Sequence, residues 1–173
     1  LYIGTRGMGA LEFRPALERA SNTLEQLQLE SLVDLAGRIL DERRSQFDGL
    51  HLALQSHEQD QALKSLFQVG SSAGGQRPKA IIAIDEKTGT LCSGQVEAPE
   101  GYSYWLFKFD VANGANSLGD PAGFGRVEYA YHLMAVAAGI HMSECRLHLD
   151  GPRAHFMTRR FDRPDGEGKL HMQ

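Results

Sequence analysis

A lysine and a glutamate 20 residues apart are the side chains of this sequence best suited to hold a phosphate chain. Lys108 lies in the segment 104–109, whose alternating bulky residues predict a β-strand, and Glu128 lies near the start of a helical pattern. Upstream of both, a glycine-serine run at 71–75 predicts a flexible loop with accessible backbone N–H groups. A lysine cation and backbone N–H groups bind phosphate oxygens, and a carboxylate can hold the cation in place.

Each of these features also has an ordinary structural interpretation. A glycine-serine cluster is more often a linker than a phosphate cradle, Lys108 could be a solvated lysine of an edge strand, and Glu128 could be an acid favoured by the helix dipole. The loop lacks the Walker and GxGxxG patterns, because Gln76 stands where a P-loop requires lysine. The three features are informative together, since the order loop, strand lysine, helix glutamate is the one that kinase small lobes use to hold ATP phosphates.

The elements expected around these residues make an α+β fold. An amphipathic helix is predicted over 23–40, started by a capping box formed by Asn22 and Glu25, and a shorter helix over 59–67. Strands are predicted over 79–85, 89–96, 104–109, 144–149 and 154–158, with a helix over 126–138 that ends at Gly139. We therefore expect a mainly helical segment over 1–68, followed over 69–173 by a five-stranded antiparallel sheet with one helix packed on it, as in a kinase small lobe.

The composition argues against several classes of protein. The net charge of −4 argues against a nucleic-acid-binding surface, which needs clustered Lys and Arg. The two cysteines form no CxxC pair, so a disulfide framework is not expected and a reducing cytoplasm is the expected location. The histidines lack the spacing of metal ligands, so no metal site is predicted. No apolar run approaches the roughly 20 residues of a membrane helix. A start without an initiator Met or a signal peptide suggests a fragment of a longer protein.

Five motifs, in family order, resemble the HipA family of bacterial serine/threonine kinase toxins. They are RGMGALEFRPA (6–16), SSAGGQRPKA (71–80), WLFKFD (105–110), VEYAYHLMAVAAGI (127–140) and MTRRFDR (157–163). The resemblance implies a kinase-like fold whose small lobe is preceded by family-specific elements. An unrelated α+β domain with chance glycine loops would require all five motifs to be coincidences.

The resemblance also implies roles for particular residues. The loop implied to cover the ATP phosphates consists of Ser71, Ser72, Ala73, Gly74 and Gly75. Ser71 best matches the autophosphorylated serine of the family, and Ser72 is the alternative. Lys108 resembles the phosphate-binding lysine and Glu128 its helix partner. Arg159 and Phe161 match the hinge strand, whose main chain meets adenine, although Arg159 replaces the acidic residue expected in that motif.

For the full-length parent the resemblance implies transfer of the γ-phosphate of ATP, with Mg²⁺, to a protein serine, in the family that of an aminoacyl-tRNA synthetase. The implied partner is a HipB-type helix-turn-helix antitoxin, so contact with DNA would be indirect. A catalytic Asp with its spaced Asn, and a DFG-like triplet, do not occur after Arg163. We therefore expect no catalytic residues, no kinase activity and weak nucleotide binding in this chain. The alternative is a non-catalytic binding or regulatory module.

Overall fold

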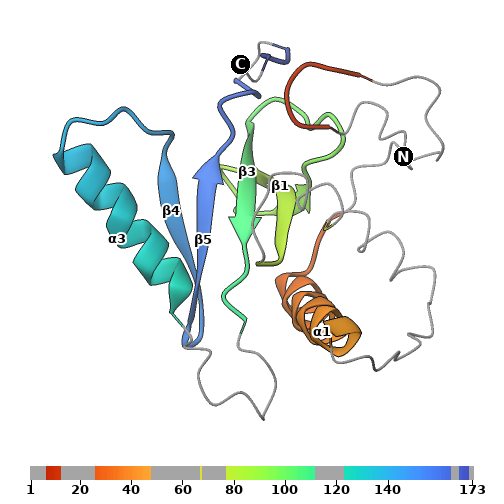
Figure 1. Cartoon of the computed structure of the whole chain (residues 1–173). Coiled ribbons are helices and arrows are strands. Elements are labelled where there is room, and N and C mark those ends of the chain that lie inside the picture. Colours follow the sequence, from red (N-terminus) through yellow and green to blue (C-terminus); the bar gives the residue numbers. More distant parts are fainter. Residues whose placement is uncertain are drawn as a thin grey trace.

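The computed structural model describes residues 7–12, 26–47, 67, 77–111, 123–164 and 168–171. Its elements in chain order are α1 (Leu29–Phe47), β1 (Lys79–Asp85), β2 (Leu91–Ser93), β3 (Tyr102–Lys108), α3 (Phe124–Ala137), β4 (Cys145–Asp150) and β5 (Arg153–Arg159) (Figure 1). The five strands form one antiparallel sheet in the order β2-β1-β3-β5-β4. The predicted α+β fold with a five-stranded antiparallel sheet is therefore confirmed, and β3 is its central strand.

The side chains of β3 alternate between buried and half-buried, because successive residues of a strand point to opposite faces of the sheet. Trp105 and Phe107 are buried in a core that they share with apolar residues of α1 and β1. Leu106 and Lys108 point to the other face and are half-buried. The expected orientation of Lys108, opposite to Phe107 and on the side of Leu106, is confirmed.

Helix α3 packs on this second face, against β4 and β5, so that the sheet separates it from α1 (Figure 1). The contact is closest at Gly125, the buried residue of α3. A Cβ atom added to Gly125 would lie 1.8 Å from the carbonyl oxygen of Ala154 in β5. Only a residue without a side chain lets the helix backbone approach the strand so closely.

The first helix begins and ends later than predicted. Residues 26–28 are not helical, because the N–H of Leu27 donates to the carbonyl of Leu91 at 2.8 Å and Gln26 pairs with Cys92. Pairing with β2 thus overrides the helical periodicity of this segment, and α1 continues to Phe47. The predicted capping box, and the second predicted helix up to residue 66, lie outside the described residues, whereas Phe67 is helical and buried.

Two further predictions about local structure differ from the observed elements. The predicted strand 89–96 is confined to Leu91–Ser93, because the chain turns at Gly94, whose N–H donates back to the carbonyl of Ile81 at 3.0 Å. Strand β3 begins two residues earlier than predicted, at Tyr102. The predicted end of the helix at Gly139 is confirmed, since this residue has the left-handed φ of 80° typical of a helix C-terminus.

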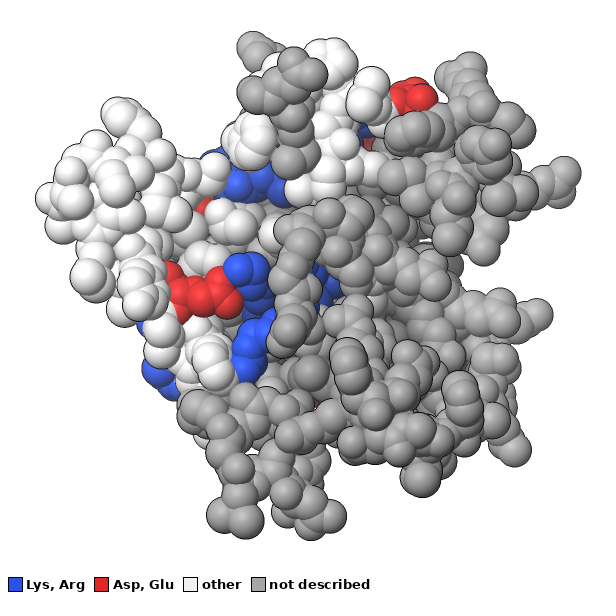
Figure 2. Space-filling view, viewed as in Figure 1, with Lys and Arg blue, Asp and Glu red and all other residues white. Residues whose placement is uncertain are grey.

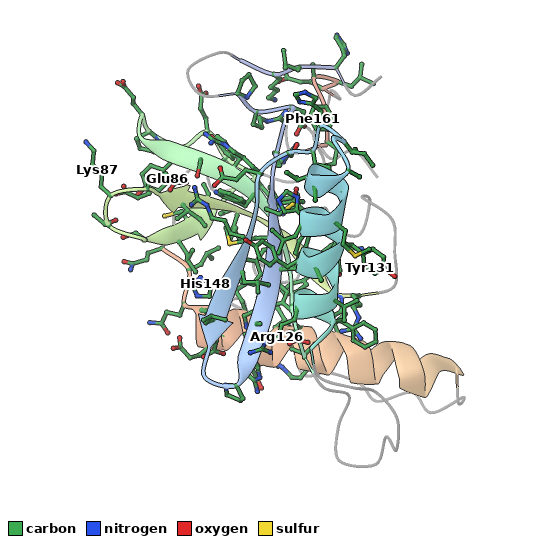
Figure 3. The ribbon with its side chains drawn as sticks, turned by 90° about the vertical axis from the view of Figure 1, so that its left-hand side faces the viewer. Glu86, Lys87, Arg126, Tyr131, His148 and Phe161 are labelled. Carbon is green, nitrogen blue, oxygen red and sulfur yellow. The ribbon has the colours of Figure 1, made fainter. Side chains whose placement is uncertain are left out.

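Large apolar side chains are exposed on α3. Leu133 and Val136, two of the positions with helical spacing, are 52% and 50% exposed, and Tyr131, which points away from the sheet in Figure 3, is 67% exposed. Because the helix is apolar around much of its circumference, the spacing of its apolar residues does not identify the buried face. Even so, no helix among the described residues has the length and apolarity needed to cross a membrane.

Candidate functional site

Lys108 and Glu128 form an ion pair between the central strand and α3. The Nζ atom of Lys108 donates to Oε2 of Glu128, and the two side chains are 29% and 30% exposed. Figure 2 shows acidic and basic side chains meeting in the hollow between α3 and the sheet. Both ordinary interpretations are wrong, because β3 is not an edge strand and Glu128 lies beyond the first turn of a helix that begins at Phe124.

Two more cations lie at the same end of the sheet. Lys79 is the direct cross-strand neighbour of Lys108, and it is only 3% exposed. The guanidinium carbon of Arg77 lies 3.5 Å from the ring centroid of Phe124, at the start of α3. Neither Lys79 nor Arg77 has a sequence pattern that predicts a role at this site.

Asp110 fixes the start of α3 relative to the sheet. Its two carboxylate oxygens accept the N–H of Gly123 at 3.0 and 3.1 Å, and one of them also accepts the N–H of Ala154 at 3.3 Å. Gly123 is the N-cap residue of α3 and has no side chain that could accept a hydrogen bond from the helix. Since Asp110 follows Lys108 by two residues, it holds the helix that carries Glu128 against the strand that carries Lys108.

His155 supports Asp110 from the interior. Its Nδ1 accepts the main-chain N–H of Asp110 at 2.8 Å, and its side chain is fully buried. Burial lowers the pKa of His155 below its usual value, although the nearby carboxylate of Asp150 acts in the opposite direction. Nε2 of His155 is 3.8 Å from Asp150, beyond hydrogen-bond distance. The ring is therefore neutral, with its proton on Nε2.

The predicted hinge begins at Arg159, the last residue of β5. The N–H of Arg159 donates to the carbonyl of Glu144 and the N–H of Arg160 to that of Tyr104, both at 2.8 Å. These two N–H groups are used within the fold and cannot also bind a base. Phe161 is 56% exposed and lies at the end of the sheet (Figure 3), so it is not part of the hydrophobic core.

A cavity of about 270 Å³ lies beside this hinge. Its lining includes Met8, Leu106, Met142, Thr158, Phe161 and Asp162. Leu106 and Thr158 are cross-strand neighbours, and Leu106 precedes Lys108 by two residues, or about 7 Å along the strand. A second hollow of about 330 Å³ shares Arg159, Arg160 and Phe161 with this cavity. It is also lined by the charged residues Glu144 and Arg163, which suit a flat apolar ring less well. An apolar cavity thus lies next to a cationic group on one face of the sheet.

The structure places the predicted site residues in two groups. Lys108 and Glu128 touch, whereas Arg159 and Phe161 lie near the other end of β5. Arg159 is the cross-strand neighbour of Trp105, so its side chain points to the face of the sheet opposite Lys108. The loop residues Ser71, Ser72, Ala73, Gly74 and Gly75 lie outside the described residues, so their role over the phosphates stays a prediction.

Comparison with known families identifies one match. The model of the HipA-like C-terminal domain matches residues 71–173, a range that contains the glycine-serine loop, Lys108, Glu128 and the hinge. No curated protein and no solved structure matched the chain. The motif at 6–16 lies before the matched range.

Proposed function

The chain belongs to the HipA family, and from this membership we propose that it contains the nucleotide-binding small lobe of a serine/threonine protein kinase. The observation that carries the proposal is the ion pair of Lys108 and Glu128 on the half-buried face of the central strand. In protein kinases an equivalent pair directs the lysine toward the α- and β-phosphates of ATP. A carboxylate in contact with Nζ also holds the lysine side chain in one orientation.

The geometry supports a bound position for the whole nucleotide. The phosphates would lie at Lys108 with Lys79 close by, and the base would enter the cavity over Leu106 and Thr158. Asp110 would act through α3, because it fixes the distance between Lys108 and the helix. Mg²⁺ would accompany the phosphates. The described residues include no group of three His, Cys, Asp or Glu able to hold a metal.

We extend the proposal to the full-length parent on family grounds. It would phosphorylate a protein serine, with an aminoacyl-tRNA synthetase as the substrate class, and a HipB-type helix-turn-helix protein as its antitoxin. Ser71, or Ser72 beside it, would be the autophosphorylated residue. A phosphoserine adds a charge of about −1.5 to −2 at pH 7, which would repel ATP phosphates from the loop and stop transfer.

A titration of the purified chain with Mg·ATP, followed by NMR, tests the proposal. We expect the amide signals of Leu106 and Lys108 to shift, with a dissociation constant of about 1 mM or weaker. We expect a low affinity because a small lobe supplies one wall of the nucleotide cleft, whereas tight sites bury most of the ligand. Lys108→Ala should abolish the shifts. Lys87→Ala is the matched control, because Lys87 is exposed in the turn between β1 and β2, away from the hollow (Figure 3).

The proposal fails in two cases. In the first, Mg·ATP leaves the signals of β3 unchanged up to tens of millimolar. In the second, the Lys108→Ala variant binds ATP as the unchanged chain does. A low-micromolar dissociation constant would instead show that the nucleotide site is complete within these 173 residues.

A further inference from the structure

We propose that Met8, which comes from the far end of the chain, forms one wall of the pocket for the nucleotide base and contributes to base binding. This inference rests on the proposed nucleotide-binding function. Met8 belongs to the motif at 6–16, which neither the kinase-like arrangement nor the family match at 71–173 explains. It lines the same cavity as Leu106, Thr158 and Phe161.

The main chain on both sides of Met8 is held by Arg163. One guanidinium nitrogen of Arg163 donates to the carbonyl of Gly9 at 3.0 Å, and another donates to the carbonyl of Gly7 at 3.1 Å. The N–H of Gly9 donates to Oδ2 of Asp162 at 2.7 Å. Both glycines are buried, and Gly9 has a left-handed φ of 74°. Met8 is therefore fixed from both sides by the residues that follow the hinge.

Asp162 is the centre of this attachment. Its side chain is 1% exposed and accepts two hydrogen bonds from Arg160, at 2.9 and 2.5 Å, as well as one from Arg163 at 3.0 Å. Burial alone would raise the pKa of the Asp162 carboxyl, but the Arg160 bonds and charge, the Gly9 N–H and the Arg163 charge hold it below its usual value. The carboxylate therefore stays charged at neutral pH.

Such an arrangement serves positioning better than stability. Buried ion pairs contribute little net stability, because the desolvation of the charges opposes their attraction. This network joins Met8 to the hinge, where a base would lie, and places the side chain at the cavity instead of in the main core cluster. Lys169 and Glu12 add a second contact between the same two segments, at 2.5 Å.

The chemistry of Met8 suits an aromatic base. A methionine side chain is flexible and polarisable, and its sulfur makes favourable contacts with aromatic rings. In the cavity a purine would lie against Leu106 and Thr158 of the sheet and against the thioether of Met8. The strength of sulfur–aromatic contacts corresponds to a change in affinity of about 2- to 10-fold when the side chain is removed.

The five methionines of the chain make the inference directly testable. Protein labelled with ¹³C in the methionine methyl groups is titrated with adenosine, ATP and inorganic tripolyphosphate. We expect adenosine and ATP to shift the signals of Met8 and Met142, which line the cavity, and tripolyphosphate to leave them unchanged. Met134, 65% exposed on α3, is the internal control for nonspecific effects.

Variants then measure the contribution of Met8. Met8→Ala should weaken adenosine binding about 2- to 10-fold, as read at the Met142 signal, while Met134→Ala leaves it unchanged. Met8→Leu keeps most of the apolar volume and should retain more affinity than Met8→Ala. The signal of Met157, which is buried in the core, shows whether each variant is folded. If a variant fails to fold, the titration of the unchanged chain still tests whether adenosine binds beside Met8.

The outcomes separate this inference from the proposed function. The inference alone is overturned if ATP shifts the signals of Lys108 while adenosine leaves Met8 unmoved, or if folded Met8→Ala binds adenosine with unchanged affinity. If neither ATP nor tripolyphosphate perturbs β3, the proposed function fails and the inference fails with it. A Met8 shift with adenosine, together with weaker binding by Met8→Ala, supports both.

Discussion

Replacing Gly125 by alanine tests the contact that holds α3 on the sheet. The added Cβ would lie 1.8 Å from the carbonyl oxygen of Ala154, 3.0 Å from its carbonyl carbon and 3.1 Å from the nitrogen of Phe156. All three are backbone atoms of β5, so no flexible side chain can move aside. Since ordinary contact begins at 3.4 Å, the helix and the strand would have to separate by about 1.6 Å, the difference between 3.4 and 1.8 Å.

The expected cost follows from this separation. Overpacking a well-filled contact typically costs about 1–3 kcal/mol, and a backbone contact belongs at the upper end of that range. Alanine gains about 1 kcal/mol over glycine in helix propensity, so the net loss of unfolding free energy should be about 2 kcal/mol. Glu128 lies one turn further along α3, so its contact with Lys108 should also be disturbed and ATP binding weakened.

Gly37→Ala in α1 is the matched control. No atom lies within 4 Å of a Cβ added at Gly37, so this variant should gain up to about 1 kcal/mol. Urea unfolding should therefore separate the two variants by about 3 kcal/mol. The reasoning is refuted if Gly125→Ala is as stable as the unchanged chain, or if both substitutions stabilise the fold equally.

Other consequences can be measured on the same protein. Glu128→Gln should lower the unfolding free energy by less than about 1 kcal/mol, because the pair with Lys108 is partly exposed. The same variant should clearly weaken ATP binding. A large loss of stability with unchanged ATP binding would contradict this. Because burial lowers the pKa of His155, the unfolded state takes up a proton first as the pH falls below about 6.5. Stability should then fall by up to about 1.4 kcal/mol per pH unit until the folded-state pKa is reached, and His155→Asn, which can still accept the N–H of Asp110, should remove this dependence. Radiolabelled ATP should give no Mg²⁺-dependent transfer by the 173-residue chain, and transfer abolished by Lys108→Ala would overturn that expectation.

The strands could be predicted from the sequence where bulky residues alternate and where turn residues mark the ends of a segment. Strand β1 has the bounds predicted, because a buried apolar run lies between a loop and the turn that ends at Thr90. The start of α1 was not predictable, since the hydrogen bond from Leu27 to Leu91 joins residues 64 positions apart and competes with helical periodicity. The exposed side of α3 also escaped prediction, because apolar residues surround the helix and the sequence does not say which side meets the sheet.

In the candidate site, the pair Lys108 and Glu128 could be predicted from the sequence, whereas the residues that hold this pair in place could not. Lys108 and Glu128 stand out by charge in strand and helix patterns, and the family motifs contain both. Asp110 appeared in the motif WLFKFD, but its role depends on Gly123 and Ala154, which only the folded chain brings to it. The register between β1 and β3 likewise decides that Lys79 lies opposite Lys108. Pairing of this kind is fixed by tertiary structure and has no local signal.

The attachment of residues 7–12 to the hinge has a consequence for the order of folding. The bond from Gly9 to Asp162 spans 153 positions, and that from Arg163 to Gly7 spans 156. Contacts so distant in sequence form late, because the chain between them must be ordered before they can stabilise anything. On the ribosome, residues 7–12 would stay unattached until Asp162 and Arg163 had been synthesised. A chain cut just before Asp162 would keep Lys108 and Glu128 in their elements, yet it would leave Met8 unattached and the base pocket without that wall.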